Sequence, residues 1–508
     1  MEDSKKKWAI LSVMSISLGM TFIDMTAVAI ALPKIQLAFY LSQSTLQWVN
    51  NAYLLVLAVF LILGGYLGDK LSHQRAMISG LIIFIIASIL CAIAPEKFWL
   101  ISSRAIQGFG AALMIPNAAV MIINAFPHHE KGKAMGIYMG SSLLFLPLAL
   151  LIGGLFTEYF SWRLIFWINV PLGIICLLGL KMLTHSIVYV PISKKFDWRG
   201  FIFLSIGIST LVIGLMESPN YKNEWYLIGG LLLTSIISLI IFYFVEKQES
   251  SPIVDFSIYK NKLVLSATIL FFTTSGSNAL FIYDAIFFQE VLGKSPAEAG
   301  LLFFPNVLCV MLAAPFAGKM LDKFGYKIPI FTGLILCCVG LILKASLASY
   351  GNYWLLLPGI ILFNIGIPFV LTSSNAAALI SVGEKKRGIT SGILSATRQI
   401  SNSVSLAILT AIIVGSNFFF LRSFLQKNQD IYPDLTPKDL ERFLIDHQGT
   451  VLNSNQPQIQ HLYQVTKQSF TWAYSLGLYA TSFIILGAFI GVFFLFRKEP
   501  AIITELKS

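Results

Sequence analysis

Charged residues are scarce in this sequence. Asp, Glu, Lys and Arg together make up 12% of the 508 residues, whereas a soluble chain averages about 25%. Hydrophobic residues make up 56%. A chain with so few charges cannot cover a water-facing surface. The composition therefore excludes an ordinary soluble protein and predicts one that crosses a membrane many times.

Cysteines and recognisable catalytic motifs are scarce as well. The five cysteines lie in apolar stretches without metal-ligand spacing, which predicts buried free thiols rather than disulfides or a metal site. No Gly-rich phosphate-binding loop of the Walker type occurs, so we do not expect ATP to be the energy source. The six His residues are scattered and form no nucleophile constellation. We therefore expect neither enzyme activity nor a cofactor.

Long apolar runs are abundant instead. A spanning helix needs about 20 mostly apolar residues, and fourteen segments meet this requirement. The first run is longer than the apolar core of a signal peptide, so we expect it to be retained. The sequence predicts an all-α integral membrane protein with transmembrane helices at 8–32, 46–68, 76–95, 98–126, 133–157, 163–183, 199–216, 225–245, 263–289, 298–319, 328–348, 353–380, 388–416 and 470–496.

The placement of Lys and Arg predicts the orientation in the membrane. An even number of spans puts both termini on one side. With Lys5, Lys6 and Lys7 inside, the inner segments carry about twice as many Lys and Arg residues as the outer segments. We therefore expect both termini in the cytoplasm and the protein in a bacterial inner membrane. The net charge of +11 then reflects inner loops and not nucleic-acid binding.

A short charged sequence occurs twice, about half the chain apart. "GGYLGDKLSHQR" (64–75) follows the second predicted span and "AGKMLDKFGYK" (317–327) follows the tenth. "EKGKAMG" (130–136) and "EKKRGITSG" (384–392) likewise open the fifth and thirteenth spans. Helices 1–6 thus match helices 9–14, and helices 7 and 8 are an insertion. Parallel repeats of this kind occur in transporters that bind substrate between two halves.

The repeat predicts the domain organisation. We expect an N-terminal six-helix bundle at 1–190, two inserted helices at 191–255 and a pseudo-symmetric C-terminal six-helix bundle at 256–508. The segment 417–469 mixes acidic and basic residues and is predicted to be an extramembrane loop. It is a candidate contact for a periplasmic adaptor protein, or it is merely a connection.

Five stretches occur in an order that is typical of one transporter family. They are "IDMTAVAIALPKI" (23–35), "GYLGDKLSHQR" (65–75), "RAIQGFGAAL" (104–113), "SWRLIFWINVPLG" (161–173) and "RGITSGILSATRQ" (387–399). Together they resemble signatures of the major facilitator superfamily, and within it the fourteen-span drug:proton antiporters. The resemblance covers nearly the whole chain and implies a secondary transporter.

The sequence departs from this pattern at a few positions. Ala29 stands where the family usually has Asn, and Ser72 stands where Gly is common. The helix 5 antiporter motif normally ends in Gly-Pro-x-x-Gly-Gly, but this chain has Ala149 and Leu150 at the Gly-Pro positions. That motif is associated with exchange, so the departure leaves the direction of transport open.

Two ionisable residues in the predicted spans are candidates for proton coupling. Asp24 is expected about 12 Å below the outer end of helix 1, and Arg104 about 9 Å below the same surface. Ionisable groups at such depth cost about 2.5–3.5 kcal/mol to insert and are usually functional. Dry surroundings and a nearby guanidinium act in opposite directions on a carboxylate's affinity for protons. The alternatives are a structural hydrogen bond for Asp24 and a snorkelling side chain for Arg104.

Asp284 and Arg398 are candidates for the substrate cavity. Asp284 is expected near the outer end of helix 9, where it pairs with a cationic substrate group or only faces vestibule water. Arg398 is expected near the membrane midplane, where it either binds an anionic group or forms a structural pair with a carboxylate or a helix end. The sequence leaves both alternatives open.

The repeated loop is predicted to form a conformational gate on the inner side. Its basic residues can pair with carboxylates or helix C-termini, and its glycines can allow close helix approach. The alternative is ordinary positive-inside charge. The candidate gate residues are Gly65, Asp69, Arg75, Gly318, Asp322 and Lys323.

The leading hypothesis is proton-coupled efflux of small amphipathic or cationic organic compounds, by alternating access between the two halves. The second is a specific exporter or importer of a metabolite, such as an organic acid or a siderophore-like compound, which Arg398 and the altered helix 5 motif favour. A third, a membrane sensor or assembly partner, predicts no substrate flux. The matching halves argue against the third hypothesis because a scaffold does not need alternating access.

Overall fold

The structure is a computed structural model in which every regular element of the described residues is a helix. The described residues are 2–127, 130, 134, 137–138, 145, 148–183, 196–218, 225–249, 252–254, 256–276, 279–382, 384–428, 432, 436–437, 440 and 457–497. Thirteen helices among them are long and apolar enough to cross a membrane. The predicted fifth span, 133–157, lies partly outside the described residues, and its described end is a shorter apolar helix, Leu148–Phe160. The all-α membrane fold is confirmed.

The helices fall into two halves and an inserted pair. The first half contains α1 (Glu2–Phe39), α2 (Gln43–Leu71), α3 (His73–Ala92), α4 (Lys97–Ala125), η2 (Phe156–Phe160), α6 (Leu164–Trp167) and α7 (Asn169–Leu183). The inserted pair is α8 (Trp198–Glu217) and α9 (Trp225–Gln248). The second half contains η3 (Phe256–Lys260), α10 (Lys262–Gly276), α11 (Ala279–Ile286), η4 (Phe287–Val291), α12 (Pro296–Leu302), α13 (Phe304–Phe324), α14 (Lys327–Leu347), η5 (Ala348–Tyr350), α15 (Tyr353–Ser381), α16 (Glu384–Lys427) and α18 (Pro457–Arg497).

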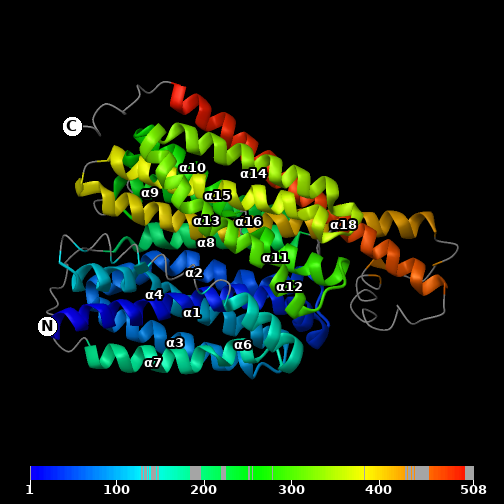
Figure 1. The fold of residues 1–508 in the computed structure, drawn as a ribbon, viewed down its shortest axis with the longest axis horizontal. Coiled ribbons are helices and arrows are strands. Elements are labelled where there is room, and N and C mark those ends of the chain that lie inside the picture. The colour runs from blue at the N-terminus through cyan, green and yellow to red at the C-terminus, as the bar shows by residue number, and fades with distance from the viewer. Residues whose placement is uncertain are drawn as a thin grey trace.

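Corresponding helices pack in the same way in both halves. In the first half, α2 and α3 pack against α4, while α1 and α3 pack against α7. In the second half, α13 and α14 pack against α15, while α10 and α14 pack against α18. α1 begins and α18 ends at one end of the molecule (Figure 1), which we call the proximal end; α1 reaches Phe39 at the opposite, distal end.

Two predicted spans are interrupted within the described residues. The span 163–183 is divided between α6 and α7. The span 263–289 contains α10 and α11, with residues 277 and 278 between them outside the described residues, and α11 continues into the π-helix η4. The span 298–319 is divided between α12 and α13 at Phe303. Pro305 lies in the first turn of α13, where its missing N–H is tolerated. A proline inside a continuous helix would remove a backbone hydrogen bond, so Pro305 favours a helix start at this point.

Helices α16 and α18 extend into the segment that the sequence predicted to be a loop. α16 continues to Lys427 and α18 already begins at Pro457, so helix occupies both ends of the segment 417–469 that was assigned to a loop. The two extensions project together at the distal end (Figure 1). They are joined by a hydrogen bond from Ser469 Oγ to Asn417 Oδ1 at 2.5 Å and by a cluster of apolar side chains. That cluster contains Leu421, Leu425, Leu440, Leu462 and Val465.

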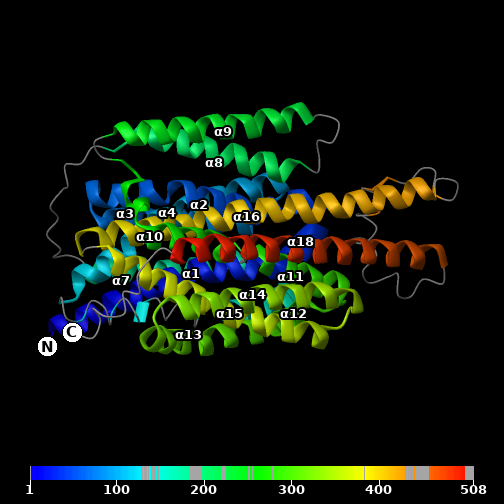
Figure 2. The ribbon, with the colours of Figure 1, turned by 90° about the horizontal axis from the view of Figure 1, so that it is seen from above.

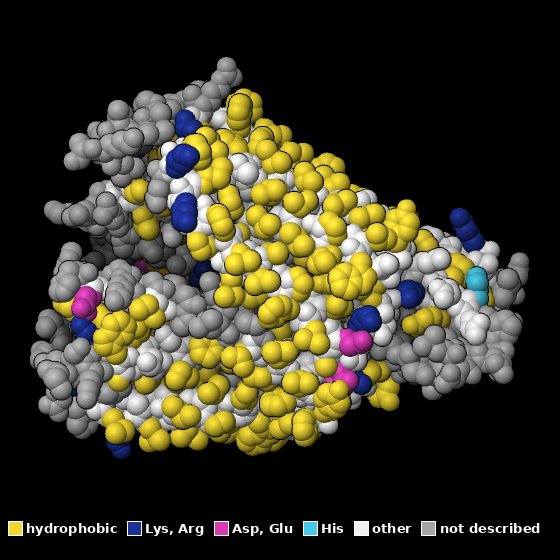
Figure 3. All heavy atoms as spheres, in the orientation of Figure 1, with side chains coloured by type: hydrophobic (Ala, Val, Ile, Leu, Met, Phe, Trp, Pro, Cys, Tyr) yellow, Lys and Arg dark blue, Asp and Glu magenta, His cyan; other side chains and the backbone are white. Residues whose placement is uncertain are grey.

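The exposed surface suits a hydrocarbon environment. One face is hydrophobic over most of its length, and most of its Lys, Arg, Asp and Glu side chains lie toward the two ends (Figure 3). The inserted helices α8 and α9 lie along one side of the bundle (Figure 2). α9 exposes large apolar side chains, including Leu233, Ile237 and Phe244. Apolar exposure on this scale is expected for helices that face lipid.

Candidate functional site

Asp24 of α1 and Arg104 of α4 form an ion pair inside the first half. Arg104 Nη1 donates to Asp24 Oδ2, and neither side chain is exposed (0% for both). The prediction that the two residues share a layer is confirmed. The snorkelling alternative for Arg104 is wrong because a snorkelling guanidinium keeps its charged end in water.

Two amide side chains complete the surroundings of the Asp24 carboxylate. Gln107 Nε2 donates to Asp24 Oδ1 at 2.8 Å, and Asn169 Nδ2 donates to the same oxygen at 3.0 Å. Both amides also donate to Ser88 Oγ, at 2.8 and 3.3 Å. Helices α1, α3, α4 and α7 thus each contribute one or more groups. Three donors, from Arg104, Gln107 and Asn169, therefore converge on the Asp24 carboxylate.

Arg104 is held independently of its carboxylate partner. Its Nε donates to the carbonyl of Val49 at 2.9 Å, its Nη1 donates to Gln107 Oε1 at 2.7 Å, and its guanidinium lies 4.5 Å from the centre of the Tyr53 ring. A guanidinium stays charged at any physiological pH. A change of protonation in this cluster therefore falls on Asp24.

Asp284 belongs to a second buried cluster, in the other half. Lys344 Nζ of α14 lies 2.7 Å from both carboxylate oxygens, and Tyr474 OH of α18 donates to Oδ1 at 2.7 Å. The exposed fractions are 4% for Asp284, 2% for Lys344 and 0% for Tyr474. The expectation that Asp284 faces vestibule water is wrong for this conformation, because Lys344 supplies the cation and the carboxylate is buried.

Arg398 belongs to neither ion pair. Its side chain is partly exposed on α16, and it forms no ion pair with another described residue. A small apolar pocket of about 40 Å³ lies between α10, α16 and α18, and neither Arg398 nor Asp284 lines it. Sites for drug-sized ligands measure about 300–1,000 Å³. This pocket is therefore too small to be the predicted substrate cavity.

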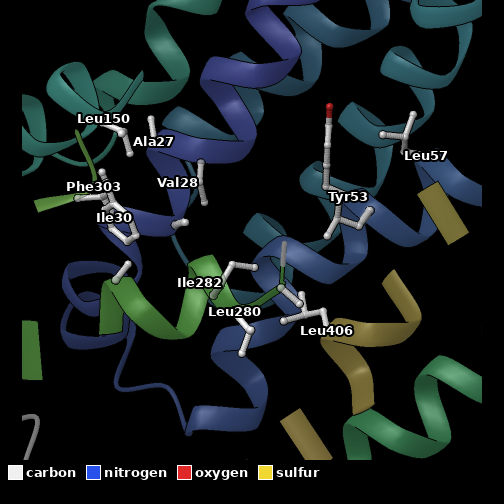
Figure 4. Packing of buried hydrophobic residues seen from close by; sticks show 14 of the residues in the cluster. Ala27, Val28, Ile30, Tyr53, Leu57, Leu150, Leu280, Ile282, Phe303 and Leu406 are labelled. Carbon is white, nitrogen blue, oxygen red and sulfur yellow. The ribbon is translucent and has the colours of Figure 1, made fainter. Parts of the chain in front are cut away.

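The two halves meet at the distal end. Gln289 Nε2 of η4 donates to the carbonyl of Ile30 on α1 at 2.9 Å. Glu158, at the end of the fifth span, accepts from Ser295 Oγ at 2.7 Å and from the N–H of Ala297 at 2.9 Å. Apolar side chains of α1 and α11, including those around Ile30, pack beside these contacts (Figure 4). The distal side is closed in this conformation.

The sequence and the fold of this chain are similar to those of known proteins. A sequence profile of the Major Facilitator Superfamily matches residues 14–406. The chain belongs to this superfamily. Its members are transporters and not enzymes, as the sequence predicted.

Curated superfamily relatives include drug exporters and a vitamin transporter. The Multidrug resistance protein Stp of Mycobacterium tuberculosis is 29% identical over 416 residues, which cover 80% of this chain and 76% of Stp. The Riboflavin transporter RibZ of Clostridioides difficile is 29% identical over 420 residues, covering 80% and 88%. The Multidrug transporter protein MdtP of Bacillus subtilis is 25% identical over 464 residues, covering 90% and 84%.

Solved structures show the same superfamily fold. A bacterial homologue of the human lysosomal transporter Spinster, in an inward-facing and unoccupied conformation, superposes with a TM-score of 0.65 at 16% identity. The match covers 98% of this chain and 99% of that one.

α2 lies very close to α4 just before the superfamily loop motif. The glycine that allows this approach is Gly64, and not the predicted Gly65. A Cβ added at Gly64 would overlap the carbonyl of Ala112, whereas one at Gly65 would meet only Pro116 Cβ at 3.9 Å, an ordinary contact. A Cβ at Gly318 would meet nothing within 4 Å. The proposed close approach at Gly65 and Gly318 is therefore wrong, and Gly64 provides it in the first half.

This difference yields a matched pair of variants. Gly64→Ala is expected to lower the free energy of unfolding by about 1–3 kcal/mol, because the added methyl group forces α2 away from α4. Gly65→Ala is expected to behave like the unaltered protein. Thermal unfolding of the two purified variants measures the difference, and equal midpoints would contradict the assignment.

The charged gate candidates are placed only in part. Asp69 Oδ1 lies 3.5 Å from His73 Nε2, and Arg75 is exposed. Lys323 is exposed beside the ring of Phe324, and the Asp322 side chain lies outside the described residues. The gating role of these four residues stays a prediction.

The backbone explains one departure from the superfamily motif. Ser72, where glycine is common, has a φ of 128°, which side-chain-bearing residues rarely adopt. Its hydroxyl accepts from the N–H of Arg75 at 3.2 Å and caps α3, which offsets part of the strain.

Sequence reasoning missed several residues of the two clusters. Gln107 and Asn169 are amides within apolar spans, and that mismatch was a usable signal. Lys344 lies a few residues before the predicted end of its span, where a lysine is typical of an interfacial anchor. Tyr474 gave no signal because tyrosine is common near the ends of membrane helices.

Proposed function

We propose that this chain exports small amphipathic or cationic organic compounds in exchange for protons, by alternating access between its two halves. The observation that carries the proposal is the fully buried Asp24, whose charged partner, Arg104, cannot give up a proton. Stp and MdtP, which are named for multidrug resistance and multidrug transport, support the substrate class.

The proton cycle follows from the surroundings of Asp24. With the distal side closed, three donors surround the carboxylate. Opening the distal side would admit water, draw the donors apart and allow Asp24 to take up a proton. Return to the closed arrangement would restore the donors and expel the proton toward the proximal side. We infer that the proximal side is cytoplasmic, so that protons move inward.

The finer parts of the proposal follow the sequence predictions. We place both termini in the cytoplasm, the protein in a bacterial inner membrane, and the bundle boundaries at 1–190, 191–255 and 256–508. Asp69, Arg75, Asp322 and Lys323 are proposed to act in the proximal gate, and Arg398 in the cavity that forms when the gate changes state. The helical extensions of α16 and α18 are the proposed contact for an adaptor protein.

The test is uptake into vesicles that contain the purified protein and an acidified lumen. Molecules inserted with the proximal side outward should accumulate ethidium while the pH gradient lasts and release it when an ionophore collapses the gradient. Uptake that ignores the pH gradient would contradict proton coupling. Protein-free vesicles with the same gradient are the control.

A metabolite transporter is the second candidate. RibZ, named as a riboflavin transporter, is as similar to this chain as Stp is, and Arg398 suits an anionic group. A thermal-shift screen distinguishes the two, because a ligand that binds the folded protein raises its apparent stability. Stabilisation by riboflavin or organic acids but by none of the dyes and antibiotics would favour the metabolite.

A further inference from the structure

The two buried charge clusters occupy corresponding helices of the two halves. Asp24 lies in the first span of its half, and Asp284 lies on α11, in the first span of the other half. Asn169 donates to Asp24 from the last helix of the first half, as Tyr474 donates to Asp284 from the last helix of the second. The third helix contributes Ser88 in one cluster and Lys344 in the other. A carboxylate with converging donors is therefore repeated.

The second cluster differs from the first in the chemistry of its cation. Lysine can lose its proton when it is buried, whereas arginine cannot. Asp284 and Lys344 have a net charge of zero as an ion pair, and closely coupled groups take up and release protons as a unit. A proton added to the Asp284 carboxyl group removes the attraction for Lys344 and leaves a net charge of +1 in a buried site. Such a state is costly unless the site opens to water.

The titratable neighbours of this cluster are already engaged. Tyr283, on the same helix, donates to Thr410 Oγ1 of α16 at 2.8 Å. Tyr353 of α15 donates to the carbonyl of Leu302 at 2.7 Å. Glu290 of η4 lies within 3.5 Å of Gln43 Nε2, in the distal contact. α1 packs against α11 with apolar side chains (Figure 4). Asp284 and Lys344 are therefore the groups in this cluster whose protonation can change.

Asp284 also lies on the segment that closes the distal side. α11 leads directly into the π-helix η4, whose Gln289 donates to Ile30 of the other half. Lys344 and Tyr474 hold α11 against α14 and α18. Protonation of Asp284 would weaken its contacts with Lys344 and Tyr474 and free α11 and η4. Proton binding at Asp284 would therefore favour opening of the distal side.

We propose that Asp284, Lys344 and Tyr474 form a second proton-binding site, and that each transport cycle carries two protons. One proton binds Asp24 and the other binds the Asp284 carboxyl group, both from the distal side. Both leave on the proximal side as one substrate molecule moves the opposite way. This inference rests on the proposed function and extends it.

The number of protons determines whether voltage drives transport. Exchange of one proton for one ethidium cation moves no net charge, whereas exchange of two protons moves one positive charge in the direction of the protons. In vesicles without a pH gradient, a lumen-positive potential should therefore drive ethidium uptake by the unaltered protein. The same potential opposes passive ethidium entry, so leakage cannot imitate the result.

The decisive variant is Asp284→Asn combined with Lys344→Gln. Both side chains become neutral together, so neither leaves an unpaired buried charge. The variant is expected to keep uptake driven by a pH gradient and to lose voltage-driven uptake to the level of protein-free vesicles. If it does not fold, Asp284→Asn combined with Lys344→Met replaces it. This variant also removes both charges together, and the same loss is expected.

The outcomes separate this inference from the proposed function. Uptake driven by a pH gradient but unaffected by voltage in the unaltered protein would overturn the second site and leave proton coupling intact. Voltage-driven uptake that persists in the variant would also overturn it. If neither gradient drives any uptake of ethidium or of any ligand from the thermal-shift screen, the proposed function fails, and the second proton site fails with it.

Discussion

Asp24→Asn is expected to abolish ethidium uptake driven by a pH gradient, to the level of protein-free vesicles. Asparagine keeps the shape of the side chain and can still accept from Gln107 and Asn169, but it cannot bind a proton. Without that step the exchange cycle stops, because the proton at Asp284 adds to the driving force but does not replace the proton at Asp24. The measurement is ethidium accumulation in vesicles with an acidified lumen, at equal amounts of reconstituted protein.

Two further variants make this result interpretable. Asp24→Glu retains a titratable carboxyl group and should keep part of the activity. Asp24→Asn combined with Arg104→Gln removes both charges, so it should fold but still not transport. Full pH-driven uptake by Asp24→Asn would remove Asp24 from the coupling mechanism.

Arg104→Gln is expected to be the most destabilising single change in the first half. It leaves the Asp24 carboxylate buried, with only the two amide donors and no countercharge. Loss of one partner of a buried ion pair typically costs about 3–5 kcal/mol. The variant should therefore unfold at a markedly lower temperature in detergent, and acidification should recover part of the loss because a protonated Asp24 no longer needs the guanidinium.

A double-mutant cycle separates the ion pair from its surroundings. When the unfolding free energies of the two single variants and the double variant are compared, the double variant should be more stable than the sum of the two single effects predicts. Strict additivity would mean that Asp24 and Arg104 do not interact in the folded protein, contrary to the contact between Nη1 and Oδ2.

The sequence predicted the spans and the first charge cluster for physical reasons. Apolar length alone locates a membrane helix, and an acid within such a run stands out. The position of Asp24 and Arg104 at similar depth followed from the rise of a helix. Breaks such as that between α12 and α13 were not predicted, because an interrupted apolar run has the same composition as a continuous one.

The second cluster could not be predicted from local sequence. Lys344 lies close enough to the end of its span to be taken for an interfacial anchor. Only the packing of α14 against the rest of its half shows that the side chain is buried and points to Asp284. The glycine contacts depend similarly on rotation about the helix axis, which decides that Gly64 and not Gly65 faces α4.

The inserted helix α8 lies across the seam between the two halves. Its side chains Phe201 and Ile208 share one apolar cluster with Leu55 of α2 and Val404 of α16. The hydrogen bond from Trp48 Nε1 to Glu217 Oε1, at 2.7 Å, ties it to α2. α8 therefore contacts both halves at once, through α2 and through α16. A tilt of one half against the other would have to change one of these two contacts, so the inserted helices would limit how far the halves can separate on this side.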